Sequence, residues 1–355
     1  MKSSPFMERY LREDIERLKP YTVHRYADLI KMDANENPFD LPTELKELIC
    51  LELRKTPINR YPDGSALDLR KALAERLLVD PDQIVMGNGS DELIGHLITL
   101  FASTKTRVLY PVPTFSMYGI ISRIQGVKTV EVPLTENFDI DPDQMMKGLV
   151  GSPNIVFLSY PNNPTGNCFD EDVIRALLER SDTLVVMDEA YFEFSGRSFL
   201  PMLDRFDNLV ILRTFSKAYG LAGLRVGYMI AQRDLAEQVN KVRLPYNLNS
   251  ISQMAALKAM RFDQEMAERV HLIISERERL YQEMLRMENV HPFPSDANFI
   301  LFRVPDATGC FEGLLERGIL VRNLDSGMLR GCLRVTVGSP KQNELFLEAL
   351  RDCVW

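Results

Sequence analysis

The chain has 355 residues, of which 45% are hydrophobic and 26% are charged, and its formal net charge at pH 7 is -8. This length and composition predict a substantial core, most simply one large domain with a smaller companion. The negative charge argues against a nucleic-acid or polyanionic membrane partner, although a local basic pocket would still bind a small anion.

The first 21 residues form a polar stretch without the apolar core of a signal peptide, and no apolar run reaches the ~18 residues of a membrane span. We expect residues 1–30 to form an N-terminal arm and part of the smaller domain. The five cysteines are odd in number and include no CxxC pair, which is typical of reduced thiols in a cytoplasmic protein. The four histidines lack metal-ligand spacing, so we expect no metal site.

Between about residues 80 and 230, short apolar runs alternate with amphipathic stretches. The apolar runs predict strands covered on both faces. These strands are 83–87, 106–111, 128–134, 154–160, 183–191, 208–216 and 226–231. Helices are expected between them, for example over 91–101 and 171–180. The alternation predicts an α/β domain, with a mainly parallel central sheet flanked by helices, which we assign to residues 31–245.

After Pro245 the pattern changes to that of a smaller α+β domain, assigned to residues 246–355. The stretch 241–250 is the expected junction. Helices are predicted over 250–260, 263–287 and 311–318, and from Gln342 onward. Strands are predicted over 298–304 and 333–338.

Two glycines follow the first of these strands, and a helix is expected to begin near Asp91. Gly87 and Gly89 would allow the backbone to approach a ligand, and the helix N-terminus would offer N–H groups to a phosphate. The stretch lacks both the Walker A and the GxGxxG patterns. An ordinary glycine turn with Ser90 or Asp91 as the helix cap explains it equally simply.

Polar groups also stand at the ends of two further strands. SYPNNPTGN (159–167) must turn, and its asparagines would also hydrogen-bond a ligand hydroxyl. Asp188 follows an apolar strand and, if buried, requires donors or a cation. A helix cap or a core salt bridge would satisfy Asp188 as well.

RTFSKAYGLAGLRVG (213–227) places Lys217 beside Ser216, with Arg225 eight residues further on. An exposed loop lysine is the ordinary interpretation of such a residue. In a pocket of low dielectric, however, burial and a neighbouring arginine would lower the pKa of the amine and make it a nucleophile. A phosphate cradle, an amide, a carboxylate for a ring nitrogen and an amine for an aldehyde together predict a site for pyridoxal 5'-phosphate (PLP).

The sequence resembles the fold type I PLP-dependent aminotransferases, and within them the histidinol-phosphate branch. The resemblance covers nearly the whole chain in the order of the family. The motifs that carry it are DANENPF (33–39), NRYPDG (59–64), GNGSDELI (87–94), PTFSMYG (113–119), YPNNPTG (160–166), DEAYFEF (188–194), RTFSKAYGLAGLRVG (213–227) and CLRVTVG (332–338).

The resemblance implies a role in cofactor binding for several of these residues. Lys217 would bond covalently to PLP and move protons, and Asp188 would keep the ring nitrogen protonated. Asn163 and Tyr191 would donate to the phenolic oxygen of the cofactor. Phe115, where many relatives carry tyrosine, would stack on the ring.

The cofactor phosphate would be bound by the backbone around Ser90 and Asp91, together with Ser216 and Arg225. Tyr61 would reach the same phosphate from a neighbouring subunit. The resemblance therefore implies a homodimer with shared active sites.

The implied substrates are histidinol phosphate and the pair 2-oxoglutarate and glutamate. Arg322 and Arg334 would bind their phosphate and carboxylate groups, and Tyr21 would add a hydroxyl to the substrate phosphate. For the two arginines, a surface salt bridge on a strand is the alternative. Asn35 would lie on a loop that closes over the substrate.

The implied reaction is transamination from L-histidinol phosphate to 2-oxoglutarate, giving imidazole-acetol phosphate and glutamate in histidine biosynthesis. Tyr246 and Asn247 would either line the imidazole side of the site or belong to a plain interdomain linker. The alternatives on the same scaffold are decarboxylation of a phosphorylated amino acid, as in threonine-phosphate decarboxylase, and transamination of aromatic amino acids. A non-enzymatic ligand-binding protein would have lost its lysine, and a nicotinamide dehydrogenase would carry GxGxxG.

Overall fold

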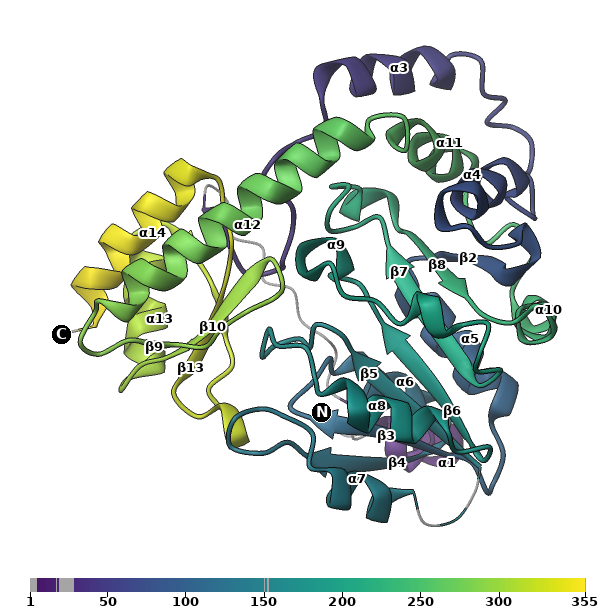
Figure 1. The fold of residues 1–355 in the computed structure, drawn as a ribbon, viewed down its shortest axis with the longest axis horizontal. Coiled ribbons are helices and arrows are strands. Elements are labelled where there is room, and N and C mark those ends of the chain that lie inside the picture. Colours follow the sequence, from purple (N-terminus) through teal and green to yellow (C-terminus); the bar gives the residue numbers. More distant parts are fainter. Residues whose placement is uncertain (1–4, 17, 19–28, 150, 152, 355) are drawn as a thin grey trace.

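A seven-stranded sheet forms the centre of the larger part of the structure (Figure 1). The computed structural model describes residues 5–16, 18, 29–149, 151 and 153–354. Along the sheet the strand order is β2-β8-β7-β6-β5-β3-β4. The strands are β2 (Ile84–Asn88), β3 (Arg107–Val112), β4 (Lys128–Pro133), β5 (Asn154–Ser159), β6 (Thr183–Asp188), β7 (Leu209–Thr214) and β8 (Val226–Ile230).

Only β8 runs against its neighbours in this sheet, pairing antiparallel with both β2 and β7, while the other neighbouring strands are parallel. The predicted α/β fold with a mainly parallel sheet is therefore confirmed. The parallel strands end at one edge, where the residues that follow them lie together.

Helices cover both faces of this sheet, which explains why its strands read as continuous apolar runs. Val210 and Leu212 of β7 face one core, with α5 (Ser90–Phe101), α6 (Met117–Ile124) and α10 (Arg233–Val242). Leu209 and Ile211 face the other core. The helices on that second face are α4 (Leu67–Leu77), α7 (Pro142–Gly148), α8 (Glu171–Leu178) and α11 (Ser250–Ala259).

A four-stranded antiparallel sheet, in the order β12-β13-β10-β9, forms the smaller part. Its strands are β9 (His291–Pro292), β10 (Phe299–Arg303), β12 (Arg322–Asn323) and β13 (Cys332–Thr336). It packs with α13 (Ala307–Glu316) and α14 (Pro340–Cys353). Beside it, β1 (Ile30–Lys31) pairs in parallel with β11 (Ile319–Leu320).

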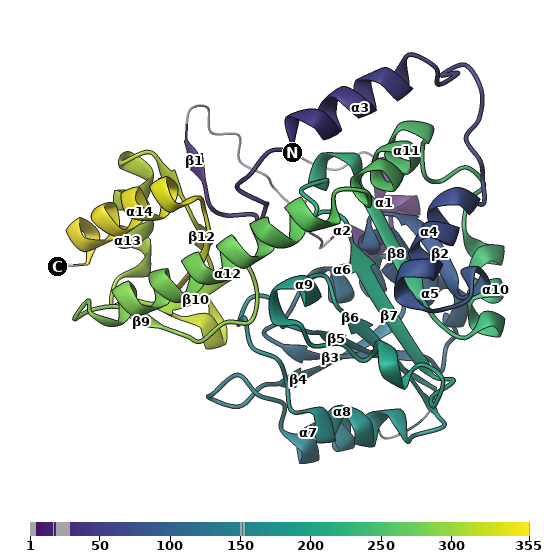
Figure 2. The same ribbon diagram turned by 45° about the horizontal axis from the view of Figure 1, so that its top comes forward.

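The two parts are bridged by α12 (Asp263–Leu285), which runs from α11 to the small sheet in both views (Figures 1 and 2). It contacts the short α9 (Phe192–Ser195) of the large part as well as β10 and α14. In the described part of the chain, no helix combines the length and apolar character that crossing a membrane requires.

Near the N-terminus lie α1 (Pro5–Tyr10) and α2 (Glu13–Glu16). Arg12 donates from Nη1 to the carbonyl of Ile124, at the end of α6, over 2.8 Å. The helix α3 (Thr43–Leu53) packs on α11. The arm is thus tied to the large part in its described residues.

Of the predicted element boundaries that differ from the structure, three have a clear local reason. The strand predicted over 183–191 ends at Asp188, because the chain turns there and the Phe192 N–H donates to the Glu189 carbonyl over 3.2 Å. The helix predicted over 311–318 begins at Ala307, where Asp306 caps it by accepting from the Gly309 N–H. Similarly, α14 begins before Gln342, since Ser339 forms a capping box with that residue.

Candidate active site

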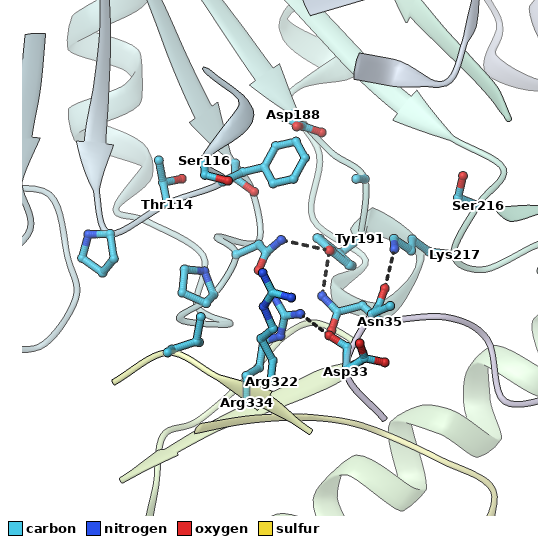
Figure 3. Close-up of a pocket in the computed structure, with 18 of the residues that line it drawn as sticks. Asp33, Asn35, Thr114, Ser116, Asp188, Tyr191, Ser216, Lys217, Arg322 and Arg334 are labelled. Carbon is cyan, nitrogen blue, oxygen red and sulfur yellow. Dashed lines mark hydrogen bonds between the residues drawn. The ribbon is translucent and has the colours of Figure 1, made fainter. Parts of the chain in front are cut away.

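A cavity of about 730 Å³ lies where the carboxyl edge of the large sheet faces the small sheet (Figure 3). Asp188 and Lys217 lie on the large-sheet side, and Arg322 and Arg334 extend toward them from the facing strands. The predicted site residues that line it are Asn35, Ser90, Asp91, Phe115, Asn163, Asp188, Tyr191, Ser216, Lys217, Arg225, Arg322 and Arg334.

Asp188 ends β6 in a buried position. Its Oδ2 accepts a hydrogen bond from the Tyr118 hydroxyl over 2.8 Å. Its Oδ1 is buried and has no hydrogen-bond partner among the described residues. Burial raises the pKa of Asp188 to about 6, although the hydrogen bond from Tyr118 acts in the opposite direction. The unsatisfied oxygen therefore calls for a donor that the described residues do not supply.

Lys217 follows β7 and is half-buried, with its Nζ donating to the Ala34 carbonyl over 3.1 Å. Burial lowers the pKa of Lys217 to about 8, and the positive charge of Arg334 lowers it further. Arg225, the neighbour expected from the sequence, acts in the same direction with a smaller effect. Roughly a tenth of the amine is thus uncharged at pH 7, far more than for an ordinary lysine, and this uncharged form is the one that acts as a nucleophile.

Two amides converge on the hydroxyl of Tyr191. Asn35 Nδ2 donates to it over 2.9 Å and Asn163 Nδ2 over 3.3 Å. Burial raises the pKa of Tyr191, so the phenol keeps its proton. Because the oxygen already accepts twice, its own proton is left to donate toward the cavity.

Asn35 is buried and held by the small sheet. Its N–H donates to Thr336 Oγ1 over 2.9 Å, and its carbonyl accepts from Asn298 Nδ2 over 3.1 Å. Its backbone lies in the left-handed region, with φ of 55°. Asn35 thus holds the Tyr191 hydroxyl, a contact that the sequence does not reveal.

Arg334 projects from β13 with its guanidinium over the ring of Phe299, at 5.1 Å from the ring centroid. Nη2 donates to the Asp33 carbonyl over 2.7 Å, and Nη1 donates to Asn163 Oδ1. Arg322 lies directly across the strand pair, opposite Arg334 in the register of β12 and β13. The two guanidinium groups give this side of the cavity a positive charge that suits phosphate or carboxylate.

The N-terminus of α5 meets Arg225 at one end of the cavity. Arg225 Nη2 pairs with Asp91 Oδ2 over 3.0 Å. A Cβ on Gly89, whose φ is 82°, would lie 2.6 Å from Arg225 Nη2, and one on Gly227 would lie 2.3 Å from the Ser90 nitrogen. Only glycine permits this approach, which brings backbone N–H groups and a guanidinium together as in anion sites.

Glycine is required at position 87 for a different reason. A Cβ there would lie 2.6 Å from Leu93 Cγ, so packing between β2 and α5 accounts for this glycine without a ligand. Ser216, in contrast, is buried in the wall of the cavity, and its Oγ accepts from Thr214 Oγ1 over 2.9 Å. Thr214 also lines the cavity, and its position at the end of β7 would have identified it.

Tyr118 is the main residue that sequence reasoning missed. It lies in α6, inside the PTFSMYG motif, and is fully buried. Phe115 of the same motif lines the cavity and meets the Tyr118 ring edge-on at 5.6 Å. A helical tyrosine three residues after a candidate stacking ring looks like a core residue, so only its hydroxyl contact with Asp188 reveals it.

Among the described candidates, Tyr61, Tyr246 and Asn247 do not line the cavity. Tyr61 is 81% exposed and stacks on Tyr246 at 4.5 Å between ring centroids. Asn247 donates to Glu92 Oε2 and to the Met86 carbonyl, which gives it a structural role within the large part. Tyr21 lies outside the described residues.

The cavity fits PLP in its chemistry. An amine with lowered pKa suits the aldehyde, and the unsatisfied buried oxygen of Asp188 suits a protonated ring nitrogen. The α5 N-terminus with Arg225 suits the phosphate. The volume also lies in the range of ordinary cofactor and substrate pockets.

Comparisons with known proteins agree with this chemistry. The family model for class I and II aminotransferases matches residues 27–350. The histidinol-phosphate aminotransferase of Caldanaerobacter subterraneus subsp. tengcongensis is 42% identical over 348 residues, covering 98% of this chain and 99% of that protein.

Two solved structures share the fold. The histidinol-phosphate aminotransferase of Sinorhizobium meliloti, in complex with pyridoxal-5'-phosphate, superposes with a TM-score of 0.84 at 26% identity, covering 91% of this chain and 90% of that one. The L-threonine-O-3-phosphate decarboxylase of Porphyromonas gingivalis reaches a TM-score of 0.76 at 26% identity, covering 91% and 99%. The fold alone therefore accommodates both reactions.

Proposed function

Because the chain belongs to the histidinol-phosphate aminotransferase family, within the class I and II aminotransferases, we propose that it transfers the amino group of L-histidinol phosphate to 2-oxoglutarate. The products are imidazole-acetol phosphate and glutamate, in a step of histidine biosynthesis. PLP is the cofactor, as in the family.

The observation that carries the proposal is the shared cavity of Lys217, Asp188 and the two arginines. An amine that is partly uncharged near pH 7 and a carboxylate with an unsatisfied oxygen lie on its large-sheet side. Two guanidinium groups lie on the small-sheet side. A molecule that carries an amine at one end and an anion at the other would contact both sides at once.

When bound, PLP supplies a ring that withdraws the electrons left on the substrate Cα after its proton leaves. Asp188 would hold a proton at the ring nitrogen through Oδ1, which keeps the ring positively charged. Tyr191 and Asn163 would donate to the phenolic oxygen, and Phe115 would pack on the ring face. The phosphate would be held by the backbone around Ser90 and Asp91, together with Ser216 and Arg225.

Lys217 would act twice. Its amine would anchor the cofactor, and once displaced by the substrate amine it would take the proton from Cα. The pKa of about 8 suits this role, because roughly a tenth of the amine is uncharged at pH 7 and the protonated form is acidic enough to return the proton. The carbonyl of Ala34, which accepts from Nζ over 3.1 Å, would hold the free amine at the cavity wall.

Arg322 and Arg334 would bind the anionic end of each substrate in turn. They would bind the phosphate of histidinol phosphate in the first half-reaction and a carboxylate of 2-oxoglutarate in the second. Planar guanidinium groups match both anions in bidentate geometry. One site thus serves two substrates, which gives ping-pong kinetics.

The proposal includes a homodimer in which Tyr61 completes the neighbouring active site. In support, the rings of Tyr61 and Tyr246 are both exposed and stack on each other at 4.5 Å between centroids. Neighbouring exposed aromatic rings favour a protein partner.

A cytoplasmic location is also part of the proposal. All five cysteines are free thiols, and two of them, Cys310 and Cys332, are buried in the small part. Proteins that keep their thiols reduced are typical of the cytoplasm.

The test is a half-reaction. PLP-loaded protein mixed with L-histidinol phosphate alone should convert stoichiometrically to the pyridoxamine form, which is visible in its absorbance, and 2-oxoglutarate should restore the original spectrum. A Lys217→Ala variant is the control and should show no conversion. Phenylalanine and O-phosphothreonine should convert the cofactor at least tenfold more slowly. Release of CO2 from O-phosphothreonine without an oxoacid would contradict transamination as the reaction.

A further inference from the structure

Tyr118 connects a buried aromatic cluster to the carboxylate at the end of β6. Its ring stacks on Phe157 at 5.0 Å between centroids, with an interplanar angle of 13°. It meets Phe115 edge-on on another side. This packing fixes the ring with its hydroxyl against Asp188 Oδ2, to which it donates over 2.8 Å.

The two carboxylate oxygens of Asp188 are therefore unequal. Oδ2 is held by the Tyr118 hydroxyl, whereas Oδ1 has no partner within the described part of the chain. We propose that Tyr118 is a positioning residue for the reaction: it orients Asp188 through Oδ2 and keeps the shared proton on the PLP ring nitrogen rather than on Asp188. This inference rests on the proposed function, since it requires PLP in the cavity.

Toward the Asp188 carboxylate, Tyr118 acts as the hydrogen-bond donor. Burial, together with the negative charge of Asp188, raises the pKa of Tyr118 well above its ordinary value. The phenol thus stays protonated, and its hydrogen bond favours the charged form of the carboxylate. Without that bond Asp188 becomes a stronger base, and the proton between Oδ1 and the ring nitrogen moves toward the oxygen.

Other charged and titratable groups near Asp188 favour its protonated form, so the hydrogen bond from the Tyr118 hydroxyl matters more for keeping it charged. Asp91 at the start of α5 and Glu189, the next residue in the chain, both raise the pKa of Asp188. Tyr191, at the start of α9, is itself affected by the Asp188 charge. Burial and two acids therefore favour the protonated carboxyl, while Tyr118 and the Ala190 backbone oppose them.

The test compares Tyr118→Phe with the parent protein, both loaded with PLP labelled with 15N in the ring. At neutral pH the 15N chemical shift should move toward the value of unprotonated pyridine in the variant. In parallel, kcat should fall roughly 10- to 100-fold, as for the loss of one hydrogen bond to a charged group, with little change in KM. In an Asp188→Asn background the same replacement should have almost no further effect, because Tyr118 acts through Asp188.

Tyr110→Phe is the matched control. Tyr110 belongs to the same aromatic cluster, and its hydroxyl donates over 2.9 Å to Glu131 Oε1, away from Asp188. Its loss should leave the 15N shift unchanged. If the shift is also unchanged in Tyr118→Phe, the hydroxyl is merely structural and the inference is wrong.

A second probe applies if the phenylalanine variant fails to fold. Fluorinated tyrosine at position 118 keeps the shape but donates more strongly, so the nitrogen should be protonated at least as fully as in the parent. A shift toward unprotonated pyridine would overturn the inference. If the parent protein binds no PLP, both the proposed function and this inference are wrong. If the parent binds PLP but the 15N shift of the variant is unchanged, only the role of Tyr118 is wrong.

Discussion

Replacement of Lys217 by methionine should stabilise the cofactor-free protein at neutral pH. The folded protein lowers the pKa of this amine from its ordinary 10.5 to about 8, mainly through burial and secondarily through Arg334. Below pH 8 the amine is charged in both folded and unfolded chains, and the folded state bears the full cost of that charge. Methionine has similar length and no charge, so it removes the cost.

The size of the effect follows from the pKa difference. A difference of about 2.5, at about 1.4 kcal/mol for each pKa unit, amounts to about 3.5 kcal/mol, of which about 3 kcal/mol is present at pH 7, where a small part of the folded amine is already uncharged. The variant also loses the hydrogen bond from Nζ to the Ala34 carbonyl, worth about 1 kcal/mol. We therefore expect a net gain of about 2 kcal/mol in the free energy of unfolding at pH 7.

The gain should disappear as pH rises. Between pH 8 and 10.5 the unfolded chain binds more protons at this amine than the folded one, so the stability of the parent increases with pH. By pH 9.5 less than half of the cost remains, on the order of 1.4 kcal/mol, and the advantage of the variant should be close to zero.

Guanidinium unfolding of the cofactor-free proteins at pH 7 and 9.5 measures both values. Lys241→Met, which removes an exposed lysine of α10, is the control and should change stability by less than about 0.5 kcal/mol at both pH values. The reasoning would be refuted if the Lys217→Met variant were less stable than the parent at pH 7. It would also be refuted if the stability difference between variant and parent were the same at both pH values.

Asp188→Asn should retain PLP but lower kcat by about 100-fold or more, because an uncharged amide stabilises a protonated ring nitrogen much less than a carboxylate does. Bound cofactor and kcat are measured together, and a parental rate would exclude the role of this carboxylate. Gly89→Ala should raise the dissociation constant for PLP roughly tenfold, measured by dialysis, because its Cβ displaces Arg225; unchanged affinity would place the phosphate elsewhere. Arg334→Lys should raise KM for both substrates roughly 100-fold in steady-state kinetics, since an ammonium lacks the planar fork; an effect on only one substrate would separate their binding sites.

Residues at the ends of parallel strands could be placed from sequence alone. Asp188 and Ser216 follow apolar runs that read clearly as buried strands, and the ends of such strands meet at one edge. The α5 N-terminus was recognised by its glycines for the same reason. The geometry of the sheet thus brings together residues that are far apart in the chain.

Contacts that depend on side-chain packing could not be placed in this way. The hydroxyl of Tyr118 meets Asp188 across 70 residues, and nothing in the α6 pattern distinguishes it from a core residue. Arg334 lowers the pKa of Lys217 through its charge, although the two residues belong to the parts built on different sheets. The start of α13 was also missed, because a capping aspartate in an otherwise apolar stretch carries little signal.

Three consecutive residues, Asp33 to Asn35, connect the functional groups of the two sheets. Asp33 accepts from Arg334, Ala34 accepts from Lys217, and Asn35 donates to Tyr191. The segment leaves β1, whose register with β11 pairs Ile30 with Ile319. Inserting or deleting a single residue between the strand and this tripeptide would shift all three contacts together. Such a change would disturb the amine, the guanidinium and the phenol at once, without altering any of these three side chains.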